Sequence, residues 1–186
     1  MSEIILVTGG ARSGKSSFAE ETAAACADDV LYIATAEPFD DEMAERIRKH
    51  RAARPKDWKT LERFSDFRDI QHMGDFLSAR AVLLDCLGLM LNNWMYYAKI
   101  NFENSDFNLF NAFEKDFLDE IENLLNICRE KDKTLIIVTN EIGMGLVPVD
   151  AVSRLYRDIL GRANKLAATR ADRVYLLVSG IPVKIK

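Results

Sequence analysis

The feature that most constrains this chain of 186 residues is an apolar strand that runs directly into a glycine-rich loop. The segment "IILVT" at 4–8 is followed by "GGARSGKSS", in which Gly9, Gly14, Lys15 and Ser16 match G-x-x-x-x-G-K-[ST]. Glycines let such a loop turn its backbone N–H groups toward phosphate oxygens, and the dipole of a following helix adds to the attraction. The segment therefore predicts a phosphate-binding loop between a buried strand and a helix.

Two side chains of this loop have separate expected roles. Lys15 is expected to reach the β- and γ-phosphates of a nucleotide, and the Ser16 hydroxyl to coordinate Mg²⁺. The alternative is a glycine-rich turn with a solvated lysine. The strand before the loop and the helical pattern after it favour the nucleotide site.

Short apolar runs alternate with helical patterns along the rest of the chain. The runs are rich in Val, Ile and Leu without polar alternation, as expected of strands buried on both faces of a parallel sheet. Strands are expected at 4–8, 30–35, 81–87, 134–139 and 173–180, with a weaker candidate at 59–64 and an edge strand in the closing "PVKIK". Helices are expected at about 15–27, 39–54, 66–79, 88–100, 109–131 and 150–170.

Together these patterns predict an α/β fold of the P-loop NTPase-like kind, as one domain over residues 1–186. Its mostly parallel sheet is flanked by helices, with a short antiparallel edge strand near the C-terminus. Pro182 suits an edge strand because it cannot donate a backbone hydrogen bond to a neighbour.

The composition disfavours several classes of binding partner and of location. The net charge is −4, which disfavours broad binding to nucleic acid or to an anionic membrane. We find no apolar run of membrane-spanning length and no export signal, so a cytoplasmic protein is expected. Cys26, Cys86 and Cys128 are odd in number and widely spaced, which favours buried or unreactive thiols over a disulfide or a zinc site.

Polar residues end two of the expected strands. Asp85 follows the apolar run "AVLL", the pattern of an acid that holds a nucleotide's Mg²⁺. Asn140 and Glu141 end "VTNE", at the carboxyl edge where ligands gather in open α/β sheets. Glu141 is open to two interpretations, since it either polarises a hydroxyl or water or caps the following loop.

A cationic segment, "RIRKHRAARP" at 46–55, contains one of the two histidines. His50 falls on the same helical face as Ile47 and Arg54, so it points inward in the expected helix. The nearby arginines favour the neutral imidazole, which leaves a lone pair for attack on phosphorus, and they offer a clamp for phosphates. A satisfied core histidine, and cations that merely complement the helix dipole, remain the alternatives. His72 is assigned no role.

The aromatic segment "NNWMYYAKINFENSDFNLFNAF" at 92–113 also has more than one interpretation. A helix–loop–helix with its aromatics in the core is the simplest. A subunit contact or a cover over a large flat ligand is the alternative, because aromatic residues are enriched at interfaces.

Several stretches taken together resemble one known family. They are "ILVTGGARSGKS", "LYIATAEPFDDEMAERIRKHRAARPKDWKTLE", "LLDC", "VTNEIGMGLVP" and "LVSGIPVKIK". Over residues 4–186 the chain is similar to the bifunctional adenosylcobinamide kinase / adenosylcobinamide-phosphate guanylyltransferase family of cobalamin biosynthesis. The P-loop alone fits many families, whereas the H-R-x-x-R-P-x-x-W stretch and "NEIGMGLVP" indicate this one.

The resemblance implies a two-step transferase. The kinase step would phosphorylate adenosylcobinamide with ATP or GTP. The guanylyltransferase step would move GMP from GTP onto that phosphate through a guanylyl-histidine, giving adenosylcobinamide-GDP and pyrophosphate. The family's reactive histidine corresponds to His50, and Lys15 of the phosphate loop is expected to be the second catalytic residue. Some relatives have another histidine directly before the reactive one, where this chain has Lys49.

The resemblance also implies the nucleotide contacts and a homotrimer. Mg²⁺ is expected on Ser16 and Asp85 from the motif and the strand end, and the charge and hydropathy predict no nucleic-acid partner and no membrane span. The implied nucleotide contacts are Gly9, Gly10, Ala11, Arg12, Ser13, Gly14, Lys15, Ser16, Ala34, Thr35, Ala36, Arg51, Ala52, Ala53, Arg54, Glu62 and Asp85. Two rival functions remain on the residues alone: a plain small-molecule kinase in which His50 is structural, and a non-catalytic nucleotide switch or nucleic-acid-binding module that uses 46–54 as a basic patch.

Overall fold

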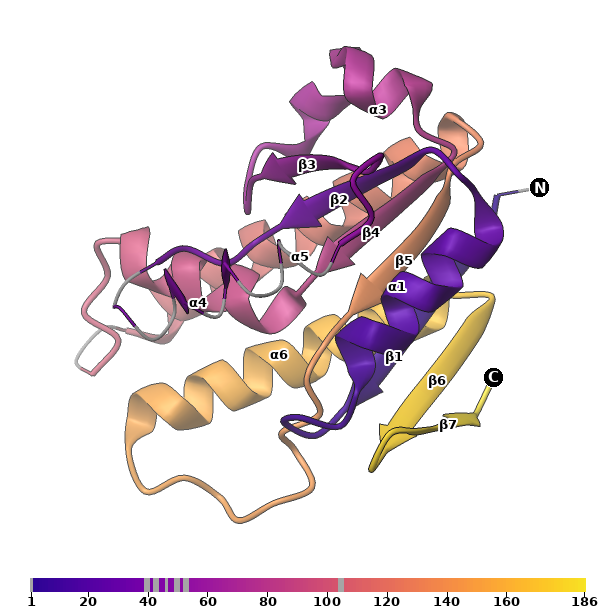
Figure 1. Ribbon diagram of the computed structural model, residues 1–186. Coiled ribbons are helices and arrows are strands. Elements are labelled where there is room, and N and C mark those ends of the chain that lie inside the picture. The colour runs from indigo at the N-terminus through magenta and orange to yellow at the C-terminus, as the bar shows by residue number, and fades with distance from the viewer. Residues whose placement is uncertain are drawn as a thin grey trace.

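The computed structural model describes residues 2–38, 41, 44–45, 47–48, 51, 54–103 and 106–186. Helices and strands alternate along the chain (Figure 1). In order they are β1 (Ile4–Gly9), α1 (Lys15–Cys26), β2 (Val30–Ala34), β3 (Lys59–Glu62), the 3₁₀ helix η1 (Phe67–His72), α3 (Gly74–Ser78), β4 (Ala81–Asp85), α4 (Leu87–Tyr97), α5 (Phe107–Glu130), β5 (Thr134–Val138), α6 (Ala151–Arg170), β6 (Arg173–Val178) and β7 (Ile181–Lys184).

A seven-stranded sheet runs through the molecule in the order β3-β2-β4-β5-β1-β6-β7. The strands from β3 to β6 pair in parallel, and β7 alone pairs antiparallel, with β6. The predicted fold class is therefore confirmed, including the antiparallel edge strand that contains Pro182. Because β1, β2, β4 and β5 are parallel, their carboxyl ends meet at one edge of the sheet.

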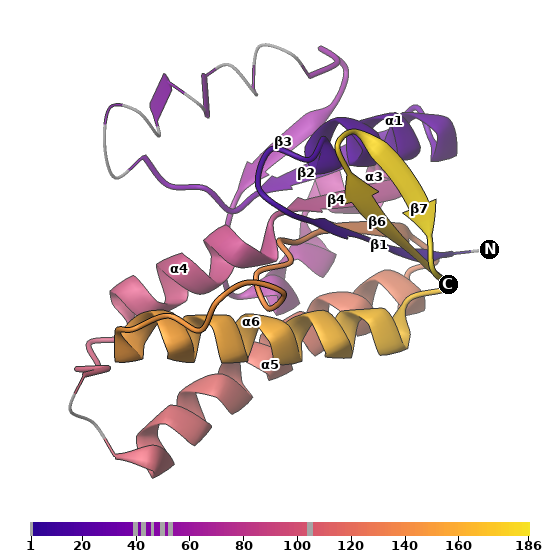
Figure 2. The same ribbon diagram turned by 90° about the horizontal axis from the view of Figure 1, so that it is seen from below.

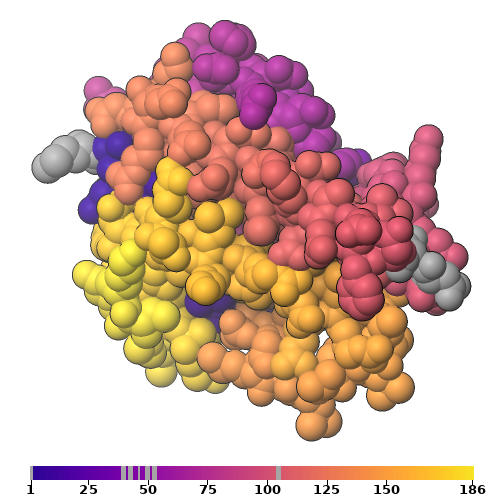
Figure 3. All heavy atoms as spheres, turned by 180° about the vertical axis from the view of Figure 1, so that it is seen from behind, coloured from indigo at the N-terminus to yellow at the C-terminus, as the bar shows by residue number. Residues whose placement is uncertain are grey.

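Helices cover both faces of the sheet, as the lack of polar alternation in the strands requires. One face packs against α4, α5 and α6, with Phe117, Ile121 and Leu160 fully or almost fully buried. The other face packs against α1 through Ala19 and Ala23. Figure 2 shows α1 on one side of the sheet and α5 and α6 on the other, and Figure 3 shows α5 and α6 forming the rear face.

Several sequence predictions differ from the structure. The strand expected at 81–87 ends at Asp85, because Leu87 already begins α4. The single helix expected at 66–79 is two short elements, η1 and α3, because Met73 between them is extended and Asp66 has a left-handed backbone. The strand expected at 173–180 ends at Val178, since Ser179 and Gly180 take positive φ angles in the turn to β7.

Of the three cysteines, Cys86 and Cys128 are buried as expected, but Cys26 is exposed. No helix in the described part of the chain has the length and apolar character needed to cross a membrane.

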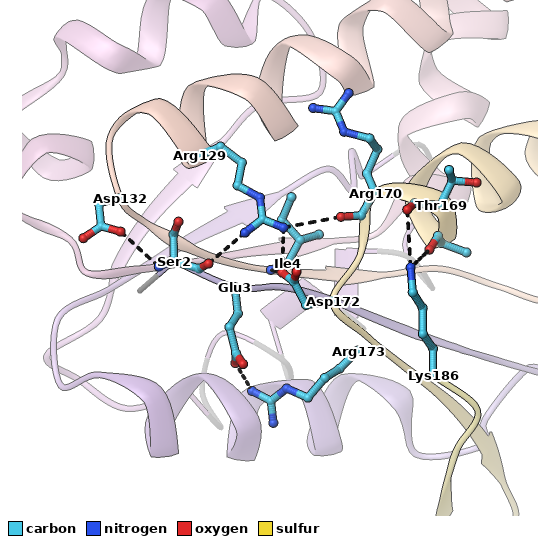
Figure 4. Close-up of polar contacts among 11 residues, drawn as sticks. Ser2, Glu3, Ile4, Arg129, Asp132, Thr169, Arg170, Asp172, Arg173 and Lys186 are labelled. Atoms are coloured by element: carbon cyan, nitrogen blue, oxygen red, sulfur yellow. Dashed lines mark hydrogen bonds and ion pairs between the residues drawn. The ribbon is translucent and has the colours of Figure 1, made fainter.

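The amino edge of the sheet, opposite the phosphate loop, is fastened by polar contacts (Figure 4). Asp172 accepts hydrogen bonds from the Ile4 backbone N–H and from the Arg129 guanidinium, both at 2.7 Å. Arg129 also donates to the Ser2 carbonyl at 2.8 Å. These contacts join the start of β1, the end of α5 and the start of β6, which are far apart in the sequence.

An Asp172→Asn variant should lose stability at neutral pH and match the wild type in acid. Burial alone would raise the pKa of Asp172, but the hydrogen bonds from Ile4 and Arg129 outweigh it and lower that pKa. A carboxylate with a lowered folded-state pKa stabilises the fold above its unfolded-state pKa of about 3.9, and this contribution disappears as the pH falls through the folded-state value. Urea unfolding at several pH values measures the difference in the free energy of unfolding between Asp172→Asn and the wild type. A gap between the two proteins that persists unchanged in acid would contradict the prediction.

Candidate active site

The predicted phosphate loop lies where β1 meets α1, and its glycines are needed for its shape. Gly14, the residue before α1, has φ +89°, and Gly9 has φ +153°. A Cβ at Gly9 would lie 2.5 Å from the carbonyl oxygen of Leu177 in β6. The turn after β6 supports the loop further, because the Gly180 N–H donates to the Ser13 carbonyl at 3.0 Å. The loop therefore packs directly on the β6–β7 hairpin.

Lys15, the first residue of α1, is held inside the loop. Its side chain is buried, and its Nζ donates to the Gly10 carbonyl at 2.5 Å. Burial lowers the pKa of Lys15, while Cys86 and Asp85 oppose that effect. An ammonium group kept from water beside one carboxylate is well suited to receive the negative charge of a phosphate.

Asp85 connects the phosphate loop to the cationic segment through a residue that the sequence analysis did not single out. The Tyr32 hydroxyl donates to Asp85 Oδ2 at 2.7 Å, and the Arg54 guanidinium carbon lies 3.5 Å from the centre of the Tyr32 ring. Burial and the Asp85 charge raise the pKa of Tyr32, so its hydroxyl stays protonated and donates. Arg54, Tyr32, Asp85 and Lys15 thus form one group at the carboxyl edge of the sheet.

The donors expected for Mg²⁺ fit a site beside the phosphate loop. Ser16 follows Lys15 at the start of α1, and only one of the two Asp85 oxygens is engaged by Tyr32. Within the described ranges, no group of three or more His, Cys, Asp or Glu side chains is arranged to hold a metal ion. Mg²⁺ needs no such cluster, since it keeps several waters and takes one or two protein ligands beside the phosphates.

A cavity of about 580 Å³ opens beside this group, at the ends of β2 and β3. Four residues expected to contact a nucleotide line it, because the parallel pairing of β2 and β3 brings residues 34–36 next to Glu62. Phe64 and Tyr97 also line it, with their rings stacked at 5.6 Å. The four expected residues are Ala34, Thr35, Ala36 and Glu62.

Thr35 is buried and holds the cavity wall together. Its hydroxyl donates to the Cys86 carbonyl and accepts from the Cys86 N–H, both at 2.8 Å. Its carbonyl accepts from the buried Asn93 amide at 2.7 Å. The Thr35 side chain thus ties β2 to the start of α4. Any contact of Thr35 with a nucleotide would have to coexist with these bonds.

The described part of the cationic segment has two kinds of arginine. Arg51 is paired with Glu62 at 3.5 Å, on the rim of the cavity, while Arg48 is paired with Glu45 one turn away. Arg48 therefore follows the ordinary pattern of a solvated helix pair, which contributes little to stability. His50, the expected nucleophile, lies outside the described residues together with Ala52 and Ala53.

The loop after β5 is fixed by its own polar groups. Glu141 Oε1 accepts the Gly143 N–H at 2.6 Å, which is the loop-capping role that the sequence left open. The Glu141 N–H donates to the Gly9 carbonyl at 2.9 Å, so this loop begins against the phosphate loop. The Asn140 carbonyl accepts from the Asn164 amide of α6 at 3.0 Å.

The aromatic segment 92–113 has some aromatic side chains in the core and others at the surface. Trp94 packs edge-on against Phe113 and Phe117 within the core, as the simpler interpretation expects. Tyr96 and Phe107 are 68% and 83% exposed, so the core interpretation does not account for the whole segment.

Comparison of the sequence with known proteins identifies the family of this chain. Residues 5–185 match the family described as cobinamide kinase / cobinamide phosphate guanyltransferase. The chain belongs to this family. It is 42% identical to the bifunctional adenosylcobalamin biosynthesis protein CobU of Escherichia coli, over 98% of this chain and 99% of that protein. It is 43% identical to CobU of Salmonella typhimurium, with the same coverage, and 39% identical to the CobP protein of Pseudomonas aeruginosa, over 97% and 96% of the two chains.

Membership of the cobinamide kinase / guanyltransferase family confirms the resemblance and makes the protein a transferase. Both named activities handle nucleotide phosphates, which agrees with a phosphate loop next to a cationic segment.

Tyr32 was not identified from the sequence as part of the site, although it contacts both Asp85 and Arg54. Its only signal in the sequence was a hydroxyl inside the otherwise apolar run "VLYIA".

Proposed function

We propose that this chain phosphorylates the hydroxyl group of cobinamide with ATP or GTP, and then transfers GMP from GTP to the new phosphate through His50. The observation that carries the proposal is the group at the carboxyl edge of the sheet. Arg54, from the segment that contains His50, lies on Tyr32, and Tyr32 bonds to Asp85 near Lys15. This contact brings the end of the histidine's own segment to the phosphate loop.

In the kinase step, the phosphate loop binds the triphosphate and Lys15 stabilises the charge on the transferred phosphoryl group. Ser16 and Asp85 would hold Mg²⁺, which when bound neutralises charge on the phosphate oxygens. The cobinamide hydroxyl oxygen attacks the γ-phosphorus, and the bond from that phosphorus to the bridging oxygen breaks. The hydroxyl proton passes to solvent or to a general base.

In the guanylyl step, an imidazole nitrogen of His50 attacks the α-phosphorus of GTP. The bond to the β-phosphate oxygen breaks and pyrophosphate leaves. A phosphate oxygen of cobinamide phosphate then attacks the same phosphorus and releases the imidazole. Arg51 and Arg54 are the cations of the described segment that could balance the charge on the GMP phosphate.

The cavity beside Glu62 is the proposed place for the rest of the nucleotide. Its acidic rim offers acceptors to base or ribose donors, and the Phe64–Tyr97 stack offers an aromatic surface.

The family resemblance further supports a single catalytic domain over residues 1–186, a homotrimer and a cytoplasmic location.

Product analysis tests the proposal. The purified protein is incubated with cobinamide, Mg²⁺ and ATP, and in parallel with cobinamide, Mg²⁺ and GTP. Mass spectrometry should find cobinamide phosphate with either nucleotide, and cobinamide-GDP with pyrophosphate only when GTP is present. Phosphorylation without pyrophosphate release would identify a plain kinase, and no product in either reaction would refute the proposal.

A further inference from the structure

A second cavity, of about 430 Å³, lies between α4 and α6, outside the group that handles phosphate. Its α4 wall consists of Asn92 and, one helical turn later, Met95 and Tyr96. Val152 and Ser153 form the opposite wall, at the start of α6. In Figure 1 this part of α4 extends away from the sheet on the same side as the start of α6.

The two walls are fixed relative to each other at the end nearest the sheet. The Tyr156 hydroxyl of α6 donates to the Gly88 carbonyl of α4 at 3.0 Å, and Tyr156 also lines the cavity. Phe102, after α4, lines it too and is held by ring contacts with Phe110 and Phe113. The cavity is therefore lined by side chains of α4, of the segment after α4 and of α6, and α5 packs against Phe102.

The chemistry of this cavity differs from that of the cavity beside Glu62. Glu37, Glu62, Arg63 and Asp66 line the first cavity, whereas no charged side chain is among the described residues that line the second. The second cavity combines aromatic and aliphatic groups with the Asn92 amide and the Ser153 hydroxyl. Such a lining favours an uncharged ligand with apolar edges and hydrogen-bonding groups over a nucleotide.

An exposed apolar loop continues the α6 wall. Met144, Leu146, Val147 and Val149 are 81%, 96%, 67% and 96% exposed, and Val149 is three residues from Val152. The loop is held in shape from α6: Arg157 donates to the Gly143 carbonyl at 2.7 Å, and Arg154 donates to the Pro148 carbonyl at 3.0 Å. Exposed apolar side chains on a backbone held in place indicate a contact surface.

The position of the cavity relative to the phosphate loop matches the shape of a cobinamide substrate. α4 begins two residues after Asp85, and Asn92 and Tyr96 follow its first residue by five and nine positions. At about 1.5 Å per residue, they lie about 8 and 14 Å along the helix. The reacting hydroxyl of cobinamide ends a flexible side arm, so its ring must lie well away from the phosphate. That ring is flat and edged with methyl groups and neutral amides.

We infer that the α4–α6 cavity and the loop 143–149 bind the corrin ring of the acceptor substrate, with the ring edge in the cavity and the side arm directed to the phosphate loop. The inference rests on the proposed function, and it adds the residues that recognise the acceptor. Asn92 and Ser153 bond the peripheral amides, and Tyr96 and Phe102 pack against the methyl groups.

Two cavity-filling variants, Ser153→Trp and Asn92→Trp, test this inference from opposite walls. Both positions are exposed, so the folded structure can accept the larger side chain. Each variant should raise the KM for cobinamide in the kinase reaction at least about tenfold, with the KM for ATP unchanged. Lys165→Trp is the matched control, an exposed position on the same helix about 18 Å from Ser153. It should behave as the wild type.

Equilibrium dialysis of cobinamide without nucleotide separates this inference from the proposed function. Wild-type protein should bind cobinamide and the two cavity variants should not, whether or not a product forms. Unchanged cobinamide binding and KM in both variants would overturn the inference. A change in sedimentation mass with an unchanged KM would overturn it as well, since the cavity would then be a contact between copies of this chain.

Discussion

A His50→Ala variant will lose the guanylyl step and keep at least part of the kinase step. Alanine removes the only nitrogen nucleophile proposed for the α-phosphorus, and we expect transfer of GMP to cobinamide phosphate to fall at least about a thousandfold. The γ-phosphoryl transfer relies on the loop at 9–16 instead, where Lys15 is held by Gly10. Incubation with GTP labelled at the α-phosphate should label the wild-type protein in an acid-labile bond and leave His50→Ala unlabelled.

His72→Ala is the matched control, because it removes the chain's other histidine. His72 is exposed at the end of η1, outside the site, so both activities should match the wild type. Equal labelling of His50→Ala and wild type would refute the covalent role of His50. Active wild-type enzyme that forms no acid-labile adduct at all would refute the covalent route itself.

A Lys15→Met variant will lose both activities without losing stability. Lys15 is the buried cation of the phosphate loop, so its loss removes charge stabilisation from both phosphorus transfers. We expect each rate to fall by about 10² to 10³, the effect of removing one preorganised donor from a transition state. Burial lowers the pKa of Lys15, which means that the fold disfavours its charged form. A methionine of similar length should therefore leave the melting temperature unchanged or raise it.

Steady-state kinetics of both steps and thermal unfolding measure the two halves of this prediction. Lys165→Met is the matched control, since Lys165 is exposed on α6 and distant from the loop. A fully active Lys15→Met protein would refute the phosphate-loop assignment. A large drop in melting temperature would show instead that Lys15 has mainly a structural role.

Much of the fold was predictable from the sequence because the signals are local. The runs that became β1, β2, β4 and β5 are continuous apolar segments, as buried parallel strands require. The helix predicted at 66–79 was wrong because Met73 and Asp66 leave the helical conformation, and periodicity alone does not show such breaks.

The site was predictable only in part. The phosphate loop and Asp85 follow from short motifs whose chemistry is contained in adjacent residues. The role of Tyr32 depends instead on two contacts between distant residues. β2 lies beside β4, which aligns Ala34 with Asp85, and the Arg54 guanidinium lies on the Tyr32 ring. Strand order is set by how the helices pack across the sheet, and no periodicity in the chain encodes it.

The sequence by itself predicted the fold class, which the structure confirms, and it proposed the phosphate loop with Lys15 and Ser16 and the candidate roles of Asp85 and His50, because each prediction depends on residues close together in the chain. Only the tertiary structure decided which distant residues meet. It put the β6–β7 hairpin against the loop, Glu62 beside residues 34–36, and α4 opposite α6 around an uncharged cavity. Such contacts depend on the strand order and on packing between helices, which exist only once the chain has folded.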